Sequence, residues 1–188
     1  METKPHLCPV WVGYILVNPL RKLMENPKKL LAPYISPGIK ILEIGPGMGY
    51  FSIPMAKMTG KNGKVYCVDI QKKMLAKLNK RAKRKGAENE LELYLYVSGS
   101  KNLQFLINQI DFCLLAYVVH EVSDQMKLFS EVAETMKQNS KVLFLEPKGH
   151  VDNVAWKESL KIAEKCGFII NESQDGRGSA RSALLIKQ

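Results

Sequence analysis

The sequence predicts an α/β protein with a mostly parallel sheet and helices on both faces. Three observations support this class. Short β-type runs alternate with helix-type segments after residue 38, a glycine-rich turn joins the first run to the next helix, and an acid ends the second run. Strands that alternate with helices are typical of parallel sheets, because each crossover helix returns the chain to the same edge.

Seven segments have β character: Ile39–Ile44, Lys64–Asp69, Leu91–Val97, Asp111–Ala116, Lys141–Glu146, Phe168–Glu172 and Ser182–Ile186. Helical spacing of apolar residues predicts helices between most of them, over Tyr50–Met58, Gln71–Lys85, Asp124–Met136 and Asn153–Lys165, with a short one around Leu103–Asn108. The last two β-type runs are separated only by a glycine-rich loop, which favours an antiparallel hairpin.

The first 35 residues differ from the rest in composition, since they are rich in aromatic residues and prolines. Within them, Asn18–Leu31 has helical spacing, and Asn18 followed by Pro19 predicts a cap and first turn. We therefore expect an N-terminal helical segment over residues 1–35 and one domain over residues 36–188.

Composition excludes several classes of protein. The 188 residues are 46% hydrophobic and 24% charged, which excludes a disordered chain. No apolar run approaches the ~18–20 residues of a membrane span, and no secretory signal is recognisable. The four cysteines form no CxxC pair, so reduced thiols in the cytoplasm are expected. The three histidines are scattered in sequence, and no metal site is predicted.

The positive charge is concentrated in one part of the chain. Residues 57–85 contain eleven Lys or Arg and a single acid, Asp69, which accounts for the formal net charge of +10. Two interpretations stay open. The cluster could bind nucleic acid or another acidic surface, or it could be the solvated face of a helix. No aromatic side chains lie among the basic ones, which disfavours single-strand binding.

The strongest motif lies between Ile41 and Ser52. A β-type run ends in Gly45, Gly47 and Gly49, and a helix follows. Glycines at this position allow a tight turn and close approach of a ligand to the backbone. Asp69 ends the second run, twenty residues after Gly49, where a carboxylate can accept hydrogen bonds from both hydroxyls of a ribose. The pair predicts a nucleoside-containing ligand.

Two residues disfavour a dinucleotide as that ligand, and with it a nucleotide-dependent dehydrogenase. Tyr50 stands where the dinucleotide pattern requires glycine. Glu43 precedes the loop, where its carboxylate would repel a pyrophosphate but would attract an ammonium or a sulfonium.

This pattern resembles that of the class I S-adenosylmethionine (SAM)-dependent methyltransferases, in which an acid precedes three spaced glycines and a second acid ends the next strand. Residues 110–122 are similar to the fourth strand and histidine segment of the ubiquinone/menaquinone-type C-methyltransferases. Residues 136–147 resemble their fifth-strand entry, with Gln-Asn-Ser in place of the usual Pro-Gly-Gly. The resemblance covers roughly residues 36–147. It implies a Rossmann-like, seven-stranded, mostly parallel sheet with an antiparallel last strand.

The resemblance also implies which residues contact the cofactor, from its methionine end to its adenine. The set comprises Glu43 at the methionine amino group, the backbone of Gly45, Pro46, Gly47 and Gly49, Asp69 at the ribose, Ile70 and Met74 beside the adenine, Gly99 and Ser100 at the adenine edge, and Ala116 and Tyr117 toward the sulfonium. Ser100 stands where the family usually has aspartate.

Three residues are candidates for the acceptor side. His120 and Glu146 follow the fourth and fifth strands and could remove a proton from an acceptor. Alternatively, His120 caps or packs against the next helix and Glu146 fixes a loop. Tyr14 lies on the N-terminal segment, which often closes over the cofactor in the family.

The function that the resemblance implies is methyl transfer from SAM to a small-molecule acceptor by in-line displacement, with S-adenosylhomocysteine as the product. The donor is already activated, so the protein has to bind the two reactants, exclude water and align them, which can supply several kcal/mol. The alternatives are an RNA or protein methyltransferase that uses the basic cluster at residues 57–85, and a SAM-binding partner protein without catalysis.

Overall fold

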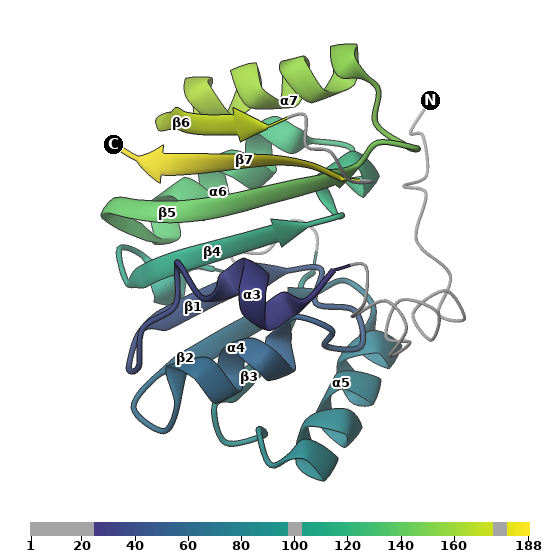
Figure 1. Cartoon of the computed structure of the whole chain (residues 1–188), viewed down its shortest axis with the longest axis vertical. Coiled ribbons are helices and arrows are strands. Elements are labelled where there is room, and N and C mark those ends of the chain that lie inside the picture. The colour runs from purple at the N-terminus through teal and green to yellow at the C-terminus, as the bar shows by residue number, and fades with distance from the viewer. Residues whose placement is uncertain (1–24, 98–102, 175–179) are drawn as a thin grey trace. The chain divides into compact units, whose positions relative to one another are not determined.

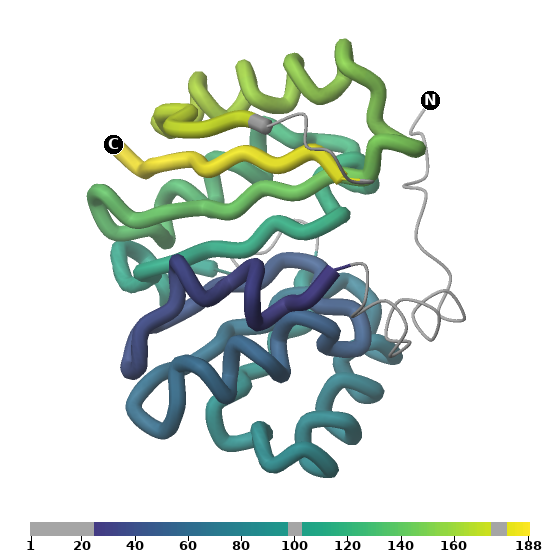
Figure 2. Tube along the Cα trace, in the orientation of Figure 1, coloured from purple at the N-terminus to yellow at the C-terminus, as the bar shows by residue number. Residues whose placement is uncertain are grey.

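The computed structural model describes residues 25–97, 103–174 and 180–188. Contacts between Cα atoms divide the described chain into two compact units. The N-terminal unit contains residues 25–97 and the C-terminal unit contains residues 103–174 and 180–188. In Figure 2 they are the purple-to-teal and the green-to-yellow parts of the tube.

The N-terminal unit is a three-stranded parallel sheet with β2 in the middle, in the order β3-β2-β1 (Figure 1). The strands are β1 (Lys40–Ile44), β2 (Lys64–Asp69) and β3 (Leu91–Leu95), and the helices are α3 (Pro27–Leu31), α4 (Ser52–Thr59) and α5 (Lys72–Lys85). Helix α4 packs against β1 and β2, while α5 packs against β2 and β3.

The C-terminal unit has four strands in the order β4-β5-β7-β6. They are β4 (Ile110–Ala116), β5 (Met136–Pro147), β6 (Phe168–Gln174) and β7 (Ala180–Lys187), with helices α6 (Gln125–Thr135) and α7 (Asn153–Lys165) and short 3₁₀ turns at Gln104–Leu106 and Val119–Glu121. Strand β5 runs parallel to β4, and β7 runs antiparallel to both of its neighbours. The predicted seven-stranded, mostly parallel sheet with an antiparallel last strand is confirmed.

Each unit has an apolar core beneath its strands. In the C-terminal unit the ring of Phe129 packs edge-on against Phe144 and Phe168, at centroid distances of 5.7 and 6.3 Å, and Trp156 covers Phe144 at 4.7 Å. Aromatic pairs in this geometry add about 0.5–1.5 kcal/mol each to the burial of their area. The α6 and α7 helices are thereby fixed against the strands.

None of the helices in the described parts of the chain is long and apolar enough to cross a membrane.

The N-terminal helix differs from its prediction. A continuous helix over Asn18–Leu31 was expected, but Glu25 and Asn26 are not helical and α3 begins at Pro27. Proline disfavours the helical conformation of the residue before it. The Asn26 side chain accepts hydrogen bonds from the backbone N–H groups of Lys28 and Lys29, so it caps the helix. The expected cap at Asn18 and Pro19 lies outside the described residues.

Strand β5 begins earlier than predicted and directly follows α6. Its first residues are out of step with β4, because Ile110 pairs with Met136 while Phe112 pairs with Lys141. Asn139 accommodates the extra residues with a φ of 63°. Asparagine tolerates this left-handed conformation better than most residues. An asparagine at this position therefore suits the irregularity of the strand.

Gly49 offers a test of how the glycine loop is packed. A Cβ atom there would lie 2.2 Å from Leu78 Cδ1, and Leu78 is fully buried. We expect Gly49→Ala to lower the free energy of unfolding by about 1–3 kcal/mol more than Gly86→Ala does. Both residues have positive φ, but a Cβ on Gly86 meets nothing within 4 Å, so the control carries only the backbone strain. Urea unfolding measures both. Equal losses would mean that Leu78 can move aside.

Candidate functional site

The glycine loop joins β1 to α4 at the carboxyl ends of the strands. Gly45, Gly47 and Gly49 all have positive φ, of 68°, 54° and 82°. The loop is closed by a hydrogen bond from the Gly49 N–H to the Pro46 carbonyl at 2.9 Å. A Cβ atom on Gly47 would meet nothing within 4 Å. At Gly49, in contrast, Leu78 occupies the space that a Cβ atom would need. Gly47 therefore leaves the backbone accessible to a ligand, and Gly49 permits the loop to pack on α5.

Asp69 connects this loop to the start of α5. Its Oδ1 accepts the Gln71 N–H at 2.8 Å, and the backbone N–H groups of Gly47 and Ile70 also bond to its carboxylate. Burial raises the pKa of Asp69, and the three backbone bonds oppose this rise. A carboxylate at the carboxyl end of β2 is the kind of acceptor that a ligand hydroxyl requires.

Glu43 is the most buried acid of the N-terminal unit, with 2% of its surface exposed. Its Oε2 accepts a hydrogen bond from Ser52 Oγ at 2.5 Å and lies 3.8 Å from Cys67 Sγ. Burial raises the pKa of Glu43 to about 7, and the charge of Asp69 adds to the rise, while Ser52 and Cys67 oppose it. The carboxyl group therefore takes up or releases a proton near neutral pH.

Ile70 and Met74 were expected to flank the adenine, and they differ in exposure. Ile70, at the end of β2, is 50% exposed, while Met74 is 3% exposed on the packed face of α5. Only Ile70 offers a large apolar surface to a ligand. Gly99, Ser100 and Tyr14, which were also expected at the site, lie outside the described residues.

In the C-terminal unit the chain turns sharply at the end of β4. After Ala116, Tyr117 adopts a φ of 59° and donates its N–H to the Leu145 carbonyl at 2.9 Å. Positive φ is strained for a bulky residue, and such strain gathers at functional sites. The bend directs the chain into the short turn that carries His120.

His120 and Glu146 are brought together by this turn. Glu146 is 1% exposed; its Oε1 accepts the His120 backbone N–H at 3.1 Å, and its Oε2 lies 2.5 Å from His120 Nδ1. The carboxylate thus bonds both the backbone of the turn and the ring of His120, and the two interpretations of these residues stay open. Since Nδ1 faces the carboxylate, Nε2 is the nitrogen able to accept a proton. The hydrogen bond to Glu146 raises the pKa of His120, and burial partly opposes it.

His150 was missed by the sequence analysis, which treated the histidines as scattered. Its ring lies edge-on to that of His120, with 5.8 Å between the centroids. The two follow the ends of β4 and β5, which are parallel neighbours. The sequence could have predicted that the two histidines lie close together, because both follow the carboxyl ends of neighbouring parallel strands. In the described part of the chain no group of three or more His, Cys, Asp or Glu is arranged to hold a metal ion.

Ser52 and Cys67 were also missed as partners of Glu43. Ser52 is the first residue of α4, and Cys67 pairs in register with Glu43 across β1 and β2. The register of two strands is a tertiary feature, so sequence spacing alone could not predict these contacts.

A parallel sheet with a glycine loop after its first strand and an acid after its second defines a class of α/β proteins that bind nucleoside-containing cofactors. Within that class, the model of the methyltransferase-domain family matches residues 41–139, more than half of the sequence. The chain belongs to this family.

Curated relatives agree with the family. A demethylmenaquinone methyltransferase of Bacillus mycoides is 29% identical over 113 residues, which cover 60% of this chain and 46% of the relative. A ubiquinone/menaquinone biosynthesis C-methyltransferase UbiE of Shewanella piezotolerans is 26% identical over 144 residues, which cover 74% of this chain and 56% of the relative. The chain thus spans about half the length of the curated relatives it matches.

Solved structures support the fold. A SAM-dependent methyltransferase from Aquifex aeolicus aligns with a TM-score of 0.85 at 21% identity, covering 97% of this chain and all of the other. An S-adenosylmethionine-dependent methyltransferase from Mesorhizobium loti aligns with a TM-score of 0.68 at 14% identity, covering 87% and 99%. At these identities the likeness establishes the fold.

The buried Glu43 predicts an unusual dependence of stability on pH. An acid whose pKa rises from 4.5 to about 7 on folding binds its proton more tightly in the folded chain. The fold therefore loses stability as the pH rises from about 4.5 to about 7, by a total of about 3 kcal/mol. The glutamine in Glu43→Gln resembles the protonated acid. In urea unfolding, the free energy of unfolding of this variant should match that of the wild type at pH 5 and exceed it at pH 8.

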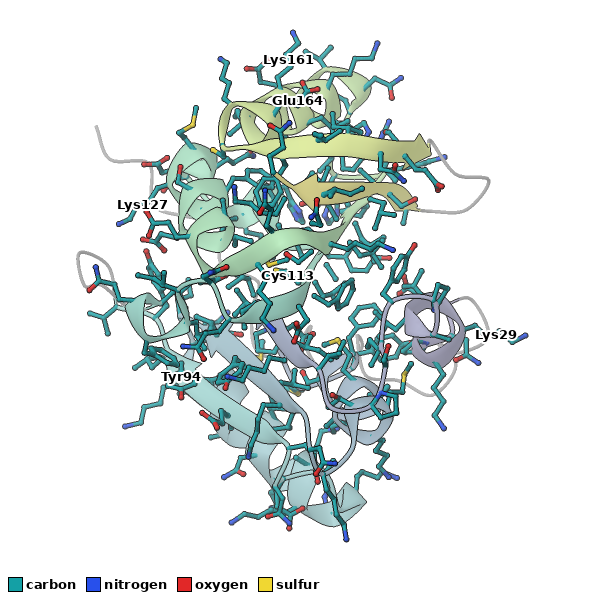
Figure 3. The ribbon with its side chains drawn as sticks, turned by 90° about the vertical axis from the view of Figure 1, so that its left-hand side faces the viewer. Lys29, Tyr94, Cys113, Lys127, Lys161 and Glu164 are labelled. Carbon is teal, nitrogen blue, oxygen red and sulfur yellow. The ribbon has the colours of Figure 1, made fainter. Side chains whose placement is uncertain are left out.

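The control for this comparison is Glu164→Gln, which removes an exposed carboxylate on α7 (Figure 3). It should follow the wild type at both pH values. If the free energy of unfolding of Glu43→Gln also changed with pH as that of the wild type does, Glu43 would be ionised in the folded protein from pH 5 to pH 8.

Proposed function

We propose that the protein is a SAM-dependent methyltransferase that acts on a small-molecule acceptor. The observation that carries the proposal is the link between Asp69 and the backbone of the glycine loop at Gly47. A Cβ atom on Gly47 would meet nothing within 4 Å, so the carboxylate and an accessible stretch of backbone lie together. A nucleoside ligand requires a hydroxyl acceptor and an accessible backbone together. Membership of the methyltransferase-domain family favours SAM over other nucleoside cofactors.

The residues of the N-terminal unit fit SAM. A side chain at Gly47 would fill the space that a ligand needs, and the carboxylate of Asp69 would accept a ribose hydroxyl. Ile70 offers an exposed apolar surface for the adenine. Glu43, once ionised, would attract the ammonium group of the methionine part. When bound, SAM supplies a methyl group that is already activated for displacement.

The C-terminal unit carries a candidate base. Glu146 holds His120 through Nδ1, so Nε2 is the nitrogen that would take a proton from an acceptor O–H or N–H, which makes the acceptor atom a better nucleophile. We assign His120 as the catalytic base and Glu146 as the residue that positions it. Ala116 ends β4, and Tyr117 leads from it toward the short turn that carries His120. Tyr14 remains a candidate for closing the site.

A small aromatic acceptor with an acidic hydroxyl is the first class to test. The curated relatives are named for methylation in ubiquinone and menaquinone biosynthesis. Loss of a proton from a ring hydroxyl raises electron density on the ring, so one base can serve O- or C-methylation. An RNA or protein methyltransferase, or a SAM-binding partner without catalysis, would lack activity on such compounds. A cytoplasmic location is part of the proposal.

Calorimetric titration with S-adenosylhomocysteine tests the donor site. We expect binding of this compound, no binding of NAD, and a roughly tenfold to hundredfold weaker affinity in Asp69→Asn, because a hydrogen bond to a charged group contributes about 1.5–3 kcal/mol. The control Asp111→Asn removes a carboxylate that pairs with Lys137 on the surface, and it should bind normally. Binding of NAD in place of S-adenosylhomocysteine would refute the proposal.

Methyl transfer to a panel of soluble phenols and hydroquinones tests the base. We expect His120→Asn to lower kcat by about 10²–10⁴-fold while S-adenosylhomocysteine still binds. In the wild type, kcat should rise with pH through the raised pKa of His120, since only the neutral ring accepts a proton. Glu146→Gln should move that rise to lower pH. Full activity of His120→Asn would leave the histidine with a structural role only.

A further inference from the structure

Helix α5 presents one continuous basic surface to solvent. Its seven exposed basic residues, here called the basic stripe, are Lys72, Lys73, Lys77, Lys80, Lys83, Arg84 and Lys85. The opposite face buries Met74, Leu75, Leu78 and Ala82. At 1.5 Å per residue, the fourteen residues of α5 make the stripe about 21 Å long. No acid occurs in the sequence between Asp69 and Glu88.

The orientation of the stripe is fixed by the packing of α5. Leu78 fills the space left by Gly49, and half-buried Arg81 donates a hydrogen bond to the Met48 carbonyl. Both contacts lie on the side of the helix that faces the glycine loop. A rotation of the helix that buried the lysines would break both contacts, so the stripe stays on the surface.

Stability of the helix does not account for this charge. Cations suit the last turn of a helix, where Lys83, Arg84 and Lys85 lie, but they are unfavourable near the first turn, where Lys72 and Lys73 lie without an acid. Like charges three or four residues apart destabilise a helix by about 0.2–0.5 kcal/mol per pair. The stripe therefore costs stability that contact with an anionic surface would offset.

The composition of the stripe distinguishes among anionic partners. Six of its seven residues are lysines, and none is aromatic. Protein interfaces and RNA sites rely on arginine forks and aromatic anchors, and protein interfaces are depleted in lysine. A membrane surface carries diffuse charge and requires no such geometry, and each Lys or Arg near it contributes about 1 kcal/mol. Diffuse charge is what a lysine stripe matches.

We propose that the basic stripe of α5 is a docking surface for an anionic phospholipid bilayer. This inference goes beyond the proposed methyltransferase function and does not depend on it. The apolar face of α5 is used in packing, so attachment is electrostatic and peripheral.

Sedimentation with vesicles tests the proposal on the full chain. Vesicles of phosphatidylcholine with phosphatidylglycerol should bind the protein, and vesicles of phosphatidylcholine alone should not. Raising the salt concentration from about 0.1 M to about 1 M shortens the screening length from about 10 to about 3 Å. The protein should therefore be released from the vesicles. A triple variant with Lys73→Gln, Lys80→Gln and Lys83→Gln should bind about a hundredfold more weakly, at about 1 kcal/mol per lysine.

The matched control removes three exposed lysines from one face of α7, with Lys157→Gln, Lys161→Gln and Lys165→Gln; Lys161 lies on the outer side of that helix in Figure 3. The net charge changes equally, so binding close to wild type supports the stripe. Equal losses in both variants, or no binding to anionic vesicles, would overturn the proposal. So would tRNA that binds the stripe and displaces the vesicles. Unchanged thermal unfolding verifies that both variants fold.

Discussion

The packing of the glycine loop on α5 is the contact on which the N-terminal unit depends. Leu78 occupies the space that a side chain at Gly49 would need, and Arg81 bonds to the Met48 carbonyl beside it. This contact determines the shape of the loop and so leaves Gly47 open. It also determines which face of α5 is exposed. The candidate donor site and the basic stripe therefore lie on opposite sides of one helix and are positioned by the same few atoms.

Asp69 shows how such a site can be formed before a ligand arrives. Its carboxylate already accepts backbone N–H groups from the glycine loop and from the start of α5. These bonds favour the charged form against the effect of burial and hold the carboxylate in place. A ligand hydroxyl then meets a fixed group, and little side-chain freedom is lost on binding.

The sequence predicted the elements that local pattern determines and missed those that tertiary pairing determines. The β2 strand and the α7 helix have the predicted bounds, because apolar alternation and helical spacing are local signals. The acid and glycine loop were predicted since their spacing is a motif. The helix start at Pro27, by contrast, was missed although Asn26 and the proline signal it locally. Ser52 beside Glu43 and His150 beside His120 depend on strand register and neighbouring loops, which no local window contains.

Glu43 and Glu146 are both almost fully buried, yet their partners give them different chemistry. Glu43 is bonded by a hydroxyl and faces a thiol, and neither partner carries a compensating charge, so burial dominates and its pKa rises to about 7. Glu146 is bonded by a backbone N–H and an imidazole, and the imidazole gains basicity from the carboxylate. A buried acid with neutral partners can respond to the charge of a ligand, whereas one bonded to an imidazole makes a base. The neighbours of each carboxylate, more than its depth, therefore determine what it can contribute.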